Sequence, residues 1–352
     1  MILDSTTKNK LLLTIAIPTF NRSEFLRRNL ERLLKEVRTV AIEVDIVISD
    51  NASTDGTSTV VMDSINAGLR VRFFRNERNL GFANNYKKCI ELALGDHVLV
   101  IGDDDQLCCG ALTYIISQII ATRCDVMCIR SFGFDYNGDQ EKPMSTPDDK
   151  VFDNANEFLS AIGPLSTQIS SCIFRKNLVS DIPDFSESND LLVNLHTLIR
   201  ATLAGKRYVF IRRFLIACKR NNSNGYDWFH IFVTCFFVIY RAYRNFGISD
   251  GLISSLENKL LKGFYPRYLF SESLSRPISR NIAKVFFGSF KRKIFFWLFC
   301  APLIYLPRPV NQLIGLILVP AGRLLDGGGR RMLAFAFSRV RILGKKTSFG
   351  GG

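Results

Sequence analysis

The chain lacks the closely spaced ligands that build disulfide scaffolds and zinc sites. Its nine cysteines include no C-x-x-C pair, and its three histidines, His97, His196 and His230, are not spaced as metal ligands. Disulfide frameworks and structural zinc sites both use tight, recurring spacings. This absence excludes both classes of small scaffold. We therefore expect reduced, mostly buried thiols in a cytosolic protein.

An apolar run long enough to cross a bilayer is also missing. The most apolar segment, Ile294–Leu306, has about thirteen residues against the ~20 needed, and the next, Leu313–Val319, stops at Pro320. The N-terminus lacks the basic-then-apolar order of a signal peptide. The basic residues Lys291–Lys293 and the nearby Trp297 favour a helix lying in the membrane interface. A helical subdomain packed against the rest of the chain, or a re-entrant hairpin, is the alternative.

Acidic residues are scarce in the C-terminal part of the chain. From Asn281 onward Asp326 is the only acid, and the whole chain carries a formal net charge of +14. A basic, apolar segment is typical of proteins that bind anionic phospholipid or nucleic acid. A nucleic-acid-binding sheet would interleave its basic residues with aromatic ones, whereas the charge here lies in the apolar C-terminal part. We expect an anionic membrane surface as a partner and no nucleic acid.

The first third of the chain alternates strand and helix patterns. Apolar runs alternate with segments that begin at polar, helix-capping residues. This spacing predicts an α/β fold with a parallel, doubly wound sheet, and right-handed crossovers place successive strand ends at one edge. The expected strands are Leu11–Ile17, Val44–Ser49, Val71–Arg75, His97–Ile101 and Asp125–Ile129, and the expected helices are Ser23–Glu36, 57–67, Phe82–Ala93 and Ala111–Thr122.

Beyond residue 130 the pattern is less regular. Phe-rich helical segments begin at Tyr226, which suggests a domain boundary there. We expect an α/β domain over 1–225, with halves at about 11–130 and 131–225, and a helical, basic and apolar region over 226–352. Within the second half we expect a polar surface loop at Gly133–Lys150, strands at Gln168–Phe174, Tyr208–Ile211 and Leu215–Cys218, and a helix at Asn189–Leu203.

Three consecutive aspartates, Asp103–Asp105, follow the strand expected at 97–101. Ligands of open α/β sheets bind where strands end. Carboxylates this close repel one another unless a cation or hydrogen-bond donors offset their charge, and Mg2+ often takes one or two carboxylates plus substrate phosphates. A solvated acidic turn capping the helix that begins near Cys109 is the alternative. Two further polar turns, Pro18–Asn21 and Asp50–Asp55, are expected at the same edge, and this convergence favours a nucleotide site.

Five short motifs lie on this framework: AIPTFN at 16–21, SDNASTDG at 49–56, NLGF at 79–82, Gly95-Asp96, and IGDDD at 101–105. Their order and spacing resemble those of family 2 nucleotide-sugar glycosyltransferases, which have the GT-A fold and mostly invert the anomeric centre. The resemblance covers about residues 11–225. It implies that the domain over 1–225 is the GT-A catalytic domain, with a nucleotide-binding half at about 11–130 and an acceptor half at about 131–225. The Gly-Asp-Asp-Asp form is similar to that of transferases of bacterial surface polysaccharides, including abequosyltransferase-like O-antigen enzymes.

The resemblance implies that the first two turns hold the nucleoside. The residues at the matching positions are Pro18, Thr19, Asn21, Asp50 and Asn51. A carboxyl or amide group can pair with the edge of a pyrimidine, which would give selectivity for the base. Helix capping by Asp50 is the alternative at that position. For Ser53 and Asp55, capping is the favoured interpretation.

The resemblance also implies that the aspartates bind a divalent metal, Mn2+ or Mg2+, on the donor diphosphate. Asp105 is the expected direct ligand, Asp104 would face the metal or the ribose, and Asp103 would lie beside the donor. Relatives usually carry an acid where this chain has Gly102, which leaves the role of Asp103 open.

Two further positions bear on the donor phosphates and on the acceptor. Many relatives carry a phosphate-binding Arg where this chain has Asn84, so Lys87, the metal, or Arg220 in a loop that often closes over the diphosphate would have to supply the charge. Asp190 matches the family's general base, although its neighbour Asn189 replaces the first acid of the usual pair. A helix cap is the alternative for Asp190.

We therefore predict a metal-dependent, inverting glycosyltransferase. It would transfer a sugar from a nucleoside-diphosphate sugar to a hydroxyl of a lipid-linked glycan, working in the cytoplasm at the inner face of the cell membrane. A nucleotide-sugar-binding protein without catalysis is one alternative. A nucleotidyltransferase is another, but it predicts a Gly-rich, basic loop after the first strand, and Pro18–Arg22 is not such a loop.

Overall fold

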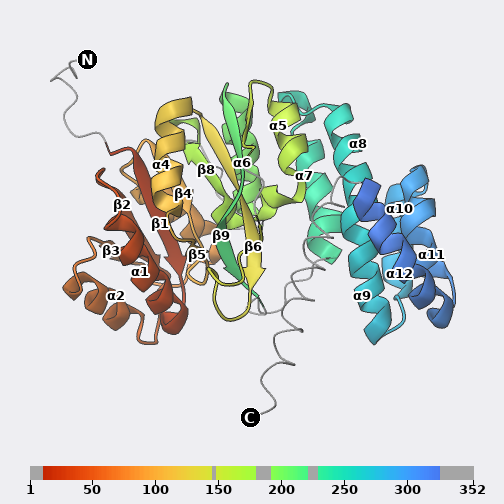
Figure 1. Ribbon diagram of the computed structural model, residues 1–352, viewed down its shortest axis with the longest axis horizontal. Helices are drawn as coiled ribbons and strands as arrows, with labels where there is room; N and C mark the ends of the chain where they lie inside the picture. The colour runs from red at the N-terminus through yellow and green to blue at the C-terminus, as the bar shows by residue number, and fades with distance from the viewer. Residues whose placement is uncertain (1–10, 145–147, 180–191, 221–228, 326–352) are drawn as a thin grey trace, which may run out of the picture. The chain divides into compact units, whose positions relative to one another are not determined.

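The computed structural model describes residues 11–144, 148–179, 192–220 and 229–325 (Figure 1). The chain divides into two compact units, Met1–Tyr226 and Asp227–Gly352. Within the described residues of the first unit, nine strands form one sheet. These strands are β1 (Leu13–Thr19), β2 (Asp45–Asp50), β3 (Arg72–Arg75), β4 (His97–Val100), β5 (Gln106–Leu107), β6 (Val126–Phe134), β7 (Lys150–Phe152), β8 (Cys172–Arg175) and β9 (Tyr208–Lys219).

The order of the strands across the sheet is β3-β2-β1-β4-β8-β6-β9-β5, and β7 pairs with β9. Neighbouring strands from β3 to β4 are parallel, and so are β6 and β9. Strand β8 runs antiparallel to both β4 and β6, and β5 and β7 run antiparallel to β9. The predicted α/β fold around a mainly parallel central sheet is confirmed, with antiparallel strands inserted in its second half.

Helices cover this sheet in two groups (Figure 1). Helix α1 contacts α2 and α4, whereas α6 contacts α3 and α5. Strand β1 is buried along its whole length, as expected for a strand covered on both faces. Leu26, Leu30 and Leu33 of α1 form the apolar stripe that packs into the core. The helices of the first unit are α1 (Ser23–Val37), α2 (Thr57–Asn66), α3 (Phe82–Leu92), α4 (Ala111–Thr122), α5 (Ala155–Ile162) and α6 (Val193–Ala204).

The second half of the sheet differs from the sequence prediction in two places. The two short strands expected at 208–211 and 215–218 are one strand, β9, whose pairing with β6 shifts register near Arg130. The strand expected from Gln168 begins only at Cys172, because a 3-10 turn occupies Ile169–Ser171. This turn brings Ser170 to the end of β4, where it takes part in the site described below.

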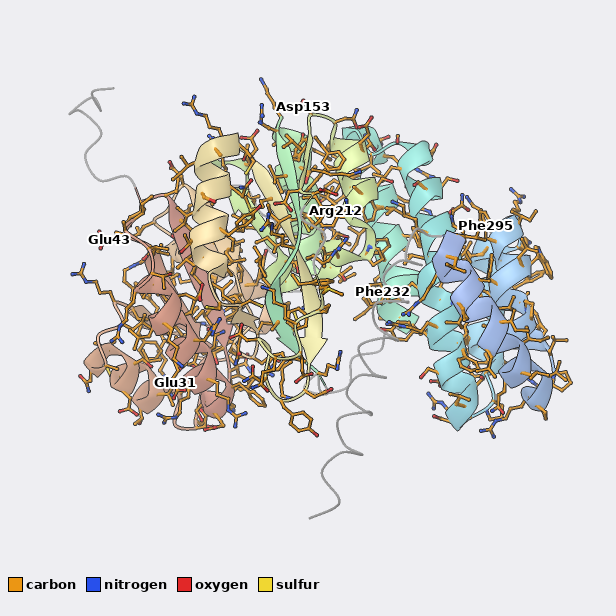
Figure 2. The ribbon with its side chains drawn as sticks, in the orientation of Figure 1. Glu31, Glu43, Asp153, Arg212, Phe232 and Phe295 are labelled. Atoms are coloured by element: carbon orange, nitrogen blue, oxygen red, sulfur yellow. The ribbon has the colours of Figure 1, made fainter. Side chains whose placement is uncertain are left out.

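The second unit is helical and rich in aromatic side chains. Tyr265 is fully buried, and its hydroxyl donates to the carbonyl of Phe232, which is labelled in Figure 2. Among the residues described, no helix combines the length and the apolar character needed to cross a bilayer. The helices are α7 (Phe236–Ala242), α8 (Asp250–Lys259), α9 (Tyr265–Ser275), α10 (Arg280–Phe290), α11 (Ala301–Tyr305) and α12 (Arg308–Leu325), with π-helical turns at His230–Cys235, Leu260–Phe264 and Phe296–Cys300.

Candidate active site

The ends of β1, β2 and β4 meet at one edge of the sheet. Thr19 is the register partner of Asp50, and the backbone N–H of Asn51 donates to the carbonyl of Thr19 at 2.9 Å. On the other side of β1, the N–H of Ile101 donates to the carbonyl of Ala16 at 2.9 Å. The structure thus brings together the three polar turns that the sequence placed at this edge.

Asp103 and Asp104 are held by residues of the first turn. The Thr19 hydroxyl donates to Oδ2 of Asp103 at 2.8 Å. The Arg22 guanidinium contacts both carboxylates, with Nε 3.3 Å from Asp103 Oδ1 and Nη2 2.8 Å from Asp104 Oδ2. Arg22 is therefore an internal counter-ion for two of the three aspartates. Sequence reasoning did not identify it, although its position one residue after Asn21 in the motif was a signal.

Asp105 is buried and is held by three neighbouring residues. The Ser170 hydroxyl donates to Asp105 Oδ2 at 2.5 Å and accepts from the N–H of Gly102 at 2.9 Å. Asn29 of α1 donates through Nδ2 to the carbonyls of Gly102 and Asp105, at 2.9 and 2.7 Å. The Cys218 thiol also hydrogen bonds to the carboxyl of Asp105. The sequence pattern pointed to none of these three neighbours.

The acidic turn does not cap the helix that follows it. The N-cap of α4 is Gly110, and no side-chain hydrogen bond caps the helix there. Glu36, almost fully buried, accepts instead from the N–H groups of Gly110 and Leu112, both at 3.1 Å. A carboxylate at a helix N-terminus is favourable, and Glu36 fills that role. The capping alternative for the aspartates is therefore wrong.

Burial gives two of these aspartates unusual proton affinities. It raises the pKa of Asp103 to about 7, although the Arg22 guanidinium opposes the shift and Asp104 adds to it. Burial, together with the charge of Asp104, also raises the pKa of Asp105 to about 7. Both carboxylates are therefore costly to ionise unless additional positive charge reaches them.

The turns after β1 and β2 are built from side chains that bond to backbone groups. Oδ1 of the fully buried Asp50 accepts from the N–H of Ser53 at 3.0 Å. Its Oδ2 accepts no hydrogen bond from the described residues, and the nearest cation, Arg75 Nε, lies 3.5 Å away. Asn21 has a left-handed backbone with φ of 52°, and its Oδ1 accepts from the N–H of Thr54 at 2.7 Å. Asp50 thus both caps a turn and keeps one oxygen for a further donor.

A second amide network joins Asn51 to the turn before α3. Its Oδ1 accepts from the N–H of Leu80 at 2.8 Å, and its Nδ2 donates to Asn79 Oδ1 at 2.7 Å. Asn84 donates from Nδ2 to the carbonyl of Leu80 at 3.1 Å, a contact within the first turn of the helix. Pro18 lies in β1 as the partner of Ser49. These contacts hold the turns of β1, β2 and α3 in one frame.

Arg220 follows β9 and lies at the same end of the sheet as the aspartates, because β5 pairs Gln106 with Ala217. Its Nη1 is 2.7 Å from Oδ2 of Asp135, and its side chain covers the backbone of Gly133, where an added Cβ would come within 2.6 Å of Nε. Asp190, the expected base, lies outside the described residues.

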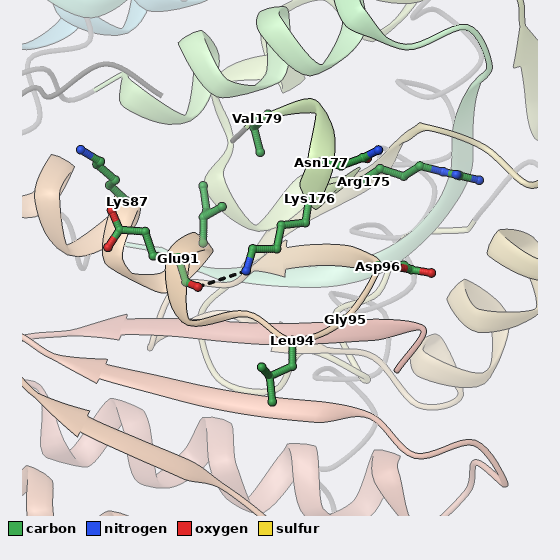
Figure 3. A pocket seen from close by; sticks show the side chains of 10 residues that line it. Lys87, Glu91, Leu94, Gly95, Asp96, Arg175, Lys176, Asn177 and Val179 are labelled. Atoms are coloured by element: carbon green, nitrogen blue, oxygen red, sulfur yellow. Dashed lines mark hydrogen bonds between the residues drawn. The ribbon is translucent and has the colours of Figure 1, made fainter. Parts of the chain in front are cut away.

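Arg175 and Lys176 lie at the opposite edge of the sheet from the aspartates. Arg175 is the last residue of β8, and Lys176 follows it. Because β8 runs antiparallel to β4, Arg175 pairs with His97 at the start of β4. There they line a cavity of about 530 Å3 with Lys87 and Asp96, and Lys176 Nζ donates to the carbonyls of Glu91 and Ala93 (Figure 3).

A divalent cation suits the acidic turn. The described residues contain no group of three His, Cys, Asp or Glu side chains arranged as a complete metal cage. Mg2+ and Mn2+, however, commonly take one or two carboxylates and complete their shell with substrate phosphates and water. The raised pKa values of Asp103 and Asp105 mark a place where positive charge is missing. The donor set and its charge therefore fit such an ion.

Comparison with models of known protein families identifies the family of this chain. The model described as "Glycosyl transferase family 2" matches residues 14–242, which is more than half of the chain. The chain belongs to glycosyl transferase family 2. This confirms the predicted family and enzyme class.

Relatives and solved structures agree with this membership. The chain is 35% identical over 120 residues to abequosyltransferase RfbV of Salmonella typhimurium, covering 33% of this chain and 36% of that protein, so it spans about a third of that relative's length. It is 22% identical over 245 residues to the GalNAc(5)-diNAcBac-PP-undecaprenol beta-1,3-glucosyltransferase of Campylobacter jejuni, covering 67% of this chain and 64% of that one.

Two solved structures share the fold. TarS 1–349 of S. aureus in complex with UDP-GlcNAc superposes with a TM-score of 0.59 and 17% identity, covering 91% of this chain and 92% of TarS 1–349. The mannosyltransferase PcManGT of Pyrobaculum calidifontis in complex with GDP-Man and Mn2+ superposes with a TM-score of 0.51 and 14% identity, covering 90% of this chain and 87% of that one. At these identities the likeness shows the fold alone.

Proposed function

We propose that this chain is a metal-dependent, inverting glycosyltransferase of cell-surface polysaccharide synthesis. The observation that carries the proposal is the convergence of Asp103–Asp105 with the turns Pro18–Asn21 and Asp50–Asp55 at one sheet edge of a family 2 chain. The donor would be a nucleoside-diphosphate sugar, the kind of molecule bound in TarS and PcManGT. The acceptor would be a hydroxyl of a lipid-linked glycan, which the name of the Campylobacter relative supports.

The first two turns would hold the nucleoside. Pro18, Thr19 and Asn21 would frame it from β1, with Asn51 as a neighbour from β2. Asp50 would use Oδ2, which accepts no hydrogen bond from the described residues, for a donor group of the base or ribose. Asn84 brings no charge to the phosphates, and Arg220 would supply positive charge there once it leaves Asp135.

Asp105 and Asp104 would hold Mn2+ or Mg2+. When bound, the ion would offset the charge of the departing nucleoside diphosphate, an effect worth several kcal/mol in metal sites. Thr19 and Ser170 would position the carboxyls of Asp103 and Asp105 for this task, because each hydroxyl donates to Oδ2 of one carboxyl.

The transfer itself needs one base. We propose that the Asp190 carboxylate takes the proton of the acceptor hydroxyl as its oxygen forms a bond with the anomeric carbon. The bond from that carbon to the diphosphate oxygen breaks on the opposite side, and the nucleoside diphosphate leaves with the electron pair. The anomeric centre is inverted by this displacement.

Asp190→Asn is expected to lower kcat by about 10²–10⁴-fold while leaving donor binding within about twofold of the parent, because a positioned base acts only on the acceptor proton. Transfer from a panel of UDP-, TDP-, GDP- and CDP-sugars would be measured alongside donor binding by thermal shift. Asp184→Asn, the same change in the same segment, is the control. Unchanged turnover in Asp190→Asn would refute the base assignment. Donor binding by the parent chain without transfer to any acceptor would point to a binding protein instead.

Mn2+ binding is expected to tighten as the pH rises from about 5 to 7 and to level off above that. The pKa of Asp105 is raised to about 7 by burial and by the charge of Asp104, so below that pH a cation must displace a proton. Calorimetry in two buffers of different ionisation enthalpy would reveal proton release at pH 6 and its absence at pH 8. A dissociation constant that does not change with pH would contradict this linkage.

We also propose that the enzyme works at the inner face of the cell membrane as a peripheral protein. A lipid-linked acceptor would be confined to that surface. The basic, apolar sequence from Asn281 onward is the part of the chain suited to it.

A further inference from the structure

Helix α12 turns its large apolar side chains outward. Leu313, Leu316, Ile317 and Leu324 are each more than 60% exposed, and Val310 is 42% exposed. These five residues, which we call the outer face of α12, recur at the three- and four-residue spacing of one helical face. No charged residue occurs from Pro309 to Gly322. A helix on the surface of a water-soluble protein normally has the opposite arrangement.

The inward side of α12 is built from small and polar residues. A Cβ added to Gly315 would come within 2.1 Å of the Phe270 ring, and one added to Gly322 within 2.0 Å of the Lys262 carbonyl. Asn311 is buried and donates to the carbonyl of Leu303 at 3.2 Å. Close packing through small residues, with the bulky apolar ones left outside, is the arrangement of helices that face lipid.

The surroundings of α12 carry positive charge and interfacial aromatic groups. From Asn281 to Leu325 there are six Lys and Arg and no Asp or Glu. Lys291 and Arg292 are exposed, and Trp297, in the π-helical turn that packs against α12, is 49% exposed. This charge complements anionic headgroups, and a Trp side chain suits the interface.

We infer that the outer face of α12 lies in the interface of an anionic lipid bilayer, with the helix parallel to the membrane plane. Arg308 and Arg323 close the apolar stretch at both ends, and Pro320 interrupts it, so the helix lies on the membrane rather than crossing it. If two copies met through this face, the basic segment would face itself, because residues 281–325 contain no Asp or Glu to offset the charge. The inference deepens the proposed function, on which its biological role rests, by naming the element that holds the enzyme beside a lipid-linked acceptor.

Flotation of the full chain with vesicles would test this inference. The parent protein is expected to float with vesicles of phosphatidylcholine and phosphatidylglycerol, and more weakly with phosphatidylcholine alone. The double variant Leu313→Glu/Ile317→Glu is expected to bind about tenfold or more weakly. Met62→Glu/Ile120→Glu is the matched control, because both of its residues are 53% exposed in the first unit. This control is expected to float like the parent.

Three results would overturn the inference. The first is equal flotation of the α12 variant and the parent, or no flotation of the parent. The second is a parent dimer that the variant converts to monomer in light scattering, which would make the outer face a contact between copies. The third is a loss of thermal stability in the variant without vesicles, which would mean that the chain itself covers the face. Transfer to a soluble acceptor is measured separately, so vesicle binding without transfer would count against the proposed function and not against the docking face.

Discussion

Replacing Asp105 by Asn is expected to lower kcat by about a thousandfold or more while the protein stays folded. Asn has almost the same shape and can still accept the hydroxyl of Ser170, which lies 2.5 Å from the carboxyl oxygen. It cannot supply a negative charge to a cation. The loss should therefore appear in turnover and in Mn2+ affinity together.

The same substitution has an expected effect on stability that separates metal binding from a structural role. The pKa of Asp105 is raised from 3.8 to about 7 in the folded chain, so the folded state holds its proton more tightly than the unfolded state. The stability of the metal-free parent should accordingly fall as the pH rises from about 4 to 7. Asn does not ionise, so Asp105→Asn should be as stable as the parent at pH 4 and more stable at pH 8.

Turnover and Mn2+ titration measure the expected losses of kcat and of Mn2+ affinity. Thermal unfolding at pH 4 and pH 8 measures the expected change in stability. Asp63→Asn, an exposed aspartate on α2, serves as the control and should change none of them. EDTA should abolish transfer by the parent. An Asp105→Asn variant that is inactive and also less stable at pH 8 would indicate a structural carboxylate, and full activity in EDTA would remove the metal from the proposal.

The edge where the site lies could be predicted from the sequence because it follows from one rule. Parallel strands joined by right-handed crossovers end on the same side, so the turns after β1, β2 and β4 had to meet. The contacts of Thr19 with Asp103 and of Asn21 with Thr54 are the result. The polar motifs and the chain topology point to the same edge of the sheet. Short motifs were therefore sufficient to predict where the site lies.

The same rule fails where the sheet is antiparallel. Strand β8 lies between β4 and β6 but runs against both, so its beginning, and not its end, lies at the edge with the aspartates. Ser170, just before β8, therefore reaches Gly102 and Asp105, whereas Arg175 at its end lies at the far edge. A single apolar run carries no sign of its direction. The sequence therefore gave no indication that Ser170 belongs to the site.

The contacts between helix α1 and the segment from the acidic turn to α4 could not be predicted from the sequence either. Glu36 and Asn29 read as ordinary polar positions on an amphipathic helix. In the structure both are almost fully buried, and each replaces a backbone partner: Glu36 at the start of α4, and Asn29 at two carbonyls of the acidic turn. Whether a polar residue points into the core at such a place depends on how α1 packs, which the periodicity of the helix does not specify.

Asn29→Leu is expected to destabilise the first unit by about 2–4 kcal/mol. Leu has a similar volume but no donors, so the carbonyls of Gly102 and Asp105, which Asn29 Nδ2 contacts at 2.9 and 2.7 Å, would lose their partner in a buried site. The midpoint of urea unfolding, followed by far-UV circular dichroism, measures the loss. Asn66→Leu, an exposed position at the end of α2, should leave the midpoint unchanged.

The substitution should also weaken Mn2+ binding by about 10–100-fold, the usual effect of losing a group that orients metal ligands. Asn29 touches no carboxylate oxygen; it holds the backbone on either side of Asp103 and Asp104, and thereby the directions of all three side chains. Asn29→Asp keeps an oxygen but loses the amide donors, so it should resemble Asn29→Leu in both measurements. If Asn29→Leu were destabilised but bound Mn2+ like the parent, Asn29 would serve only to attach α1 to the sheet, and the acidic turn would keep its geometry through Thr19, Arg22 and Ser170 alone.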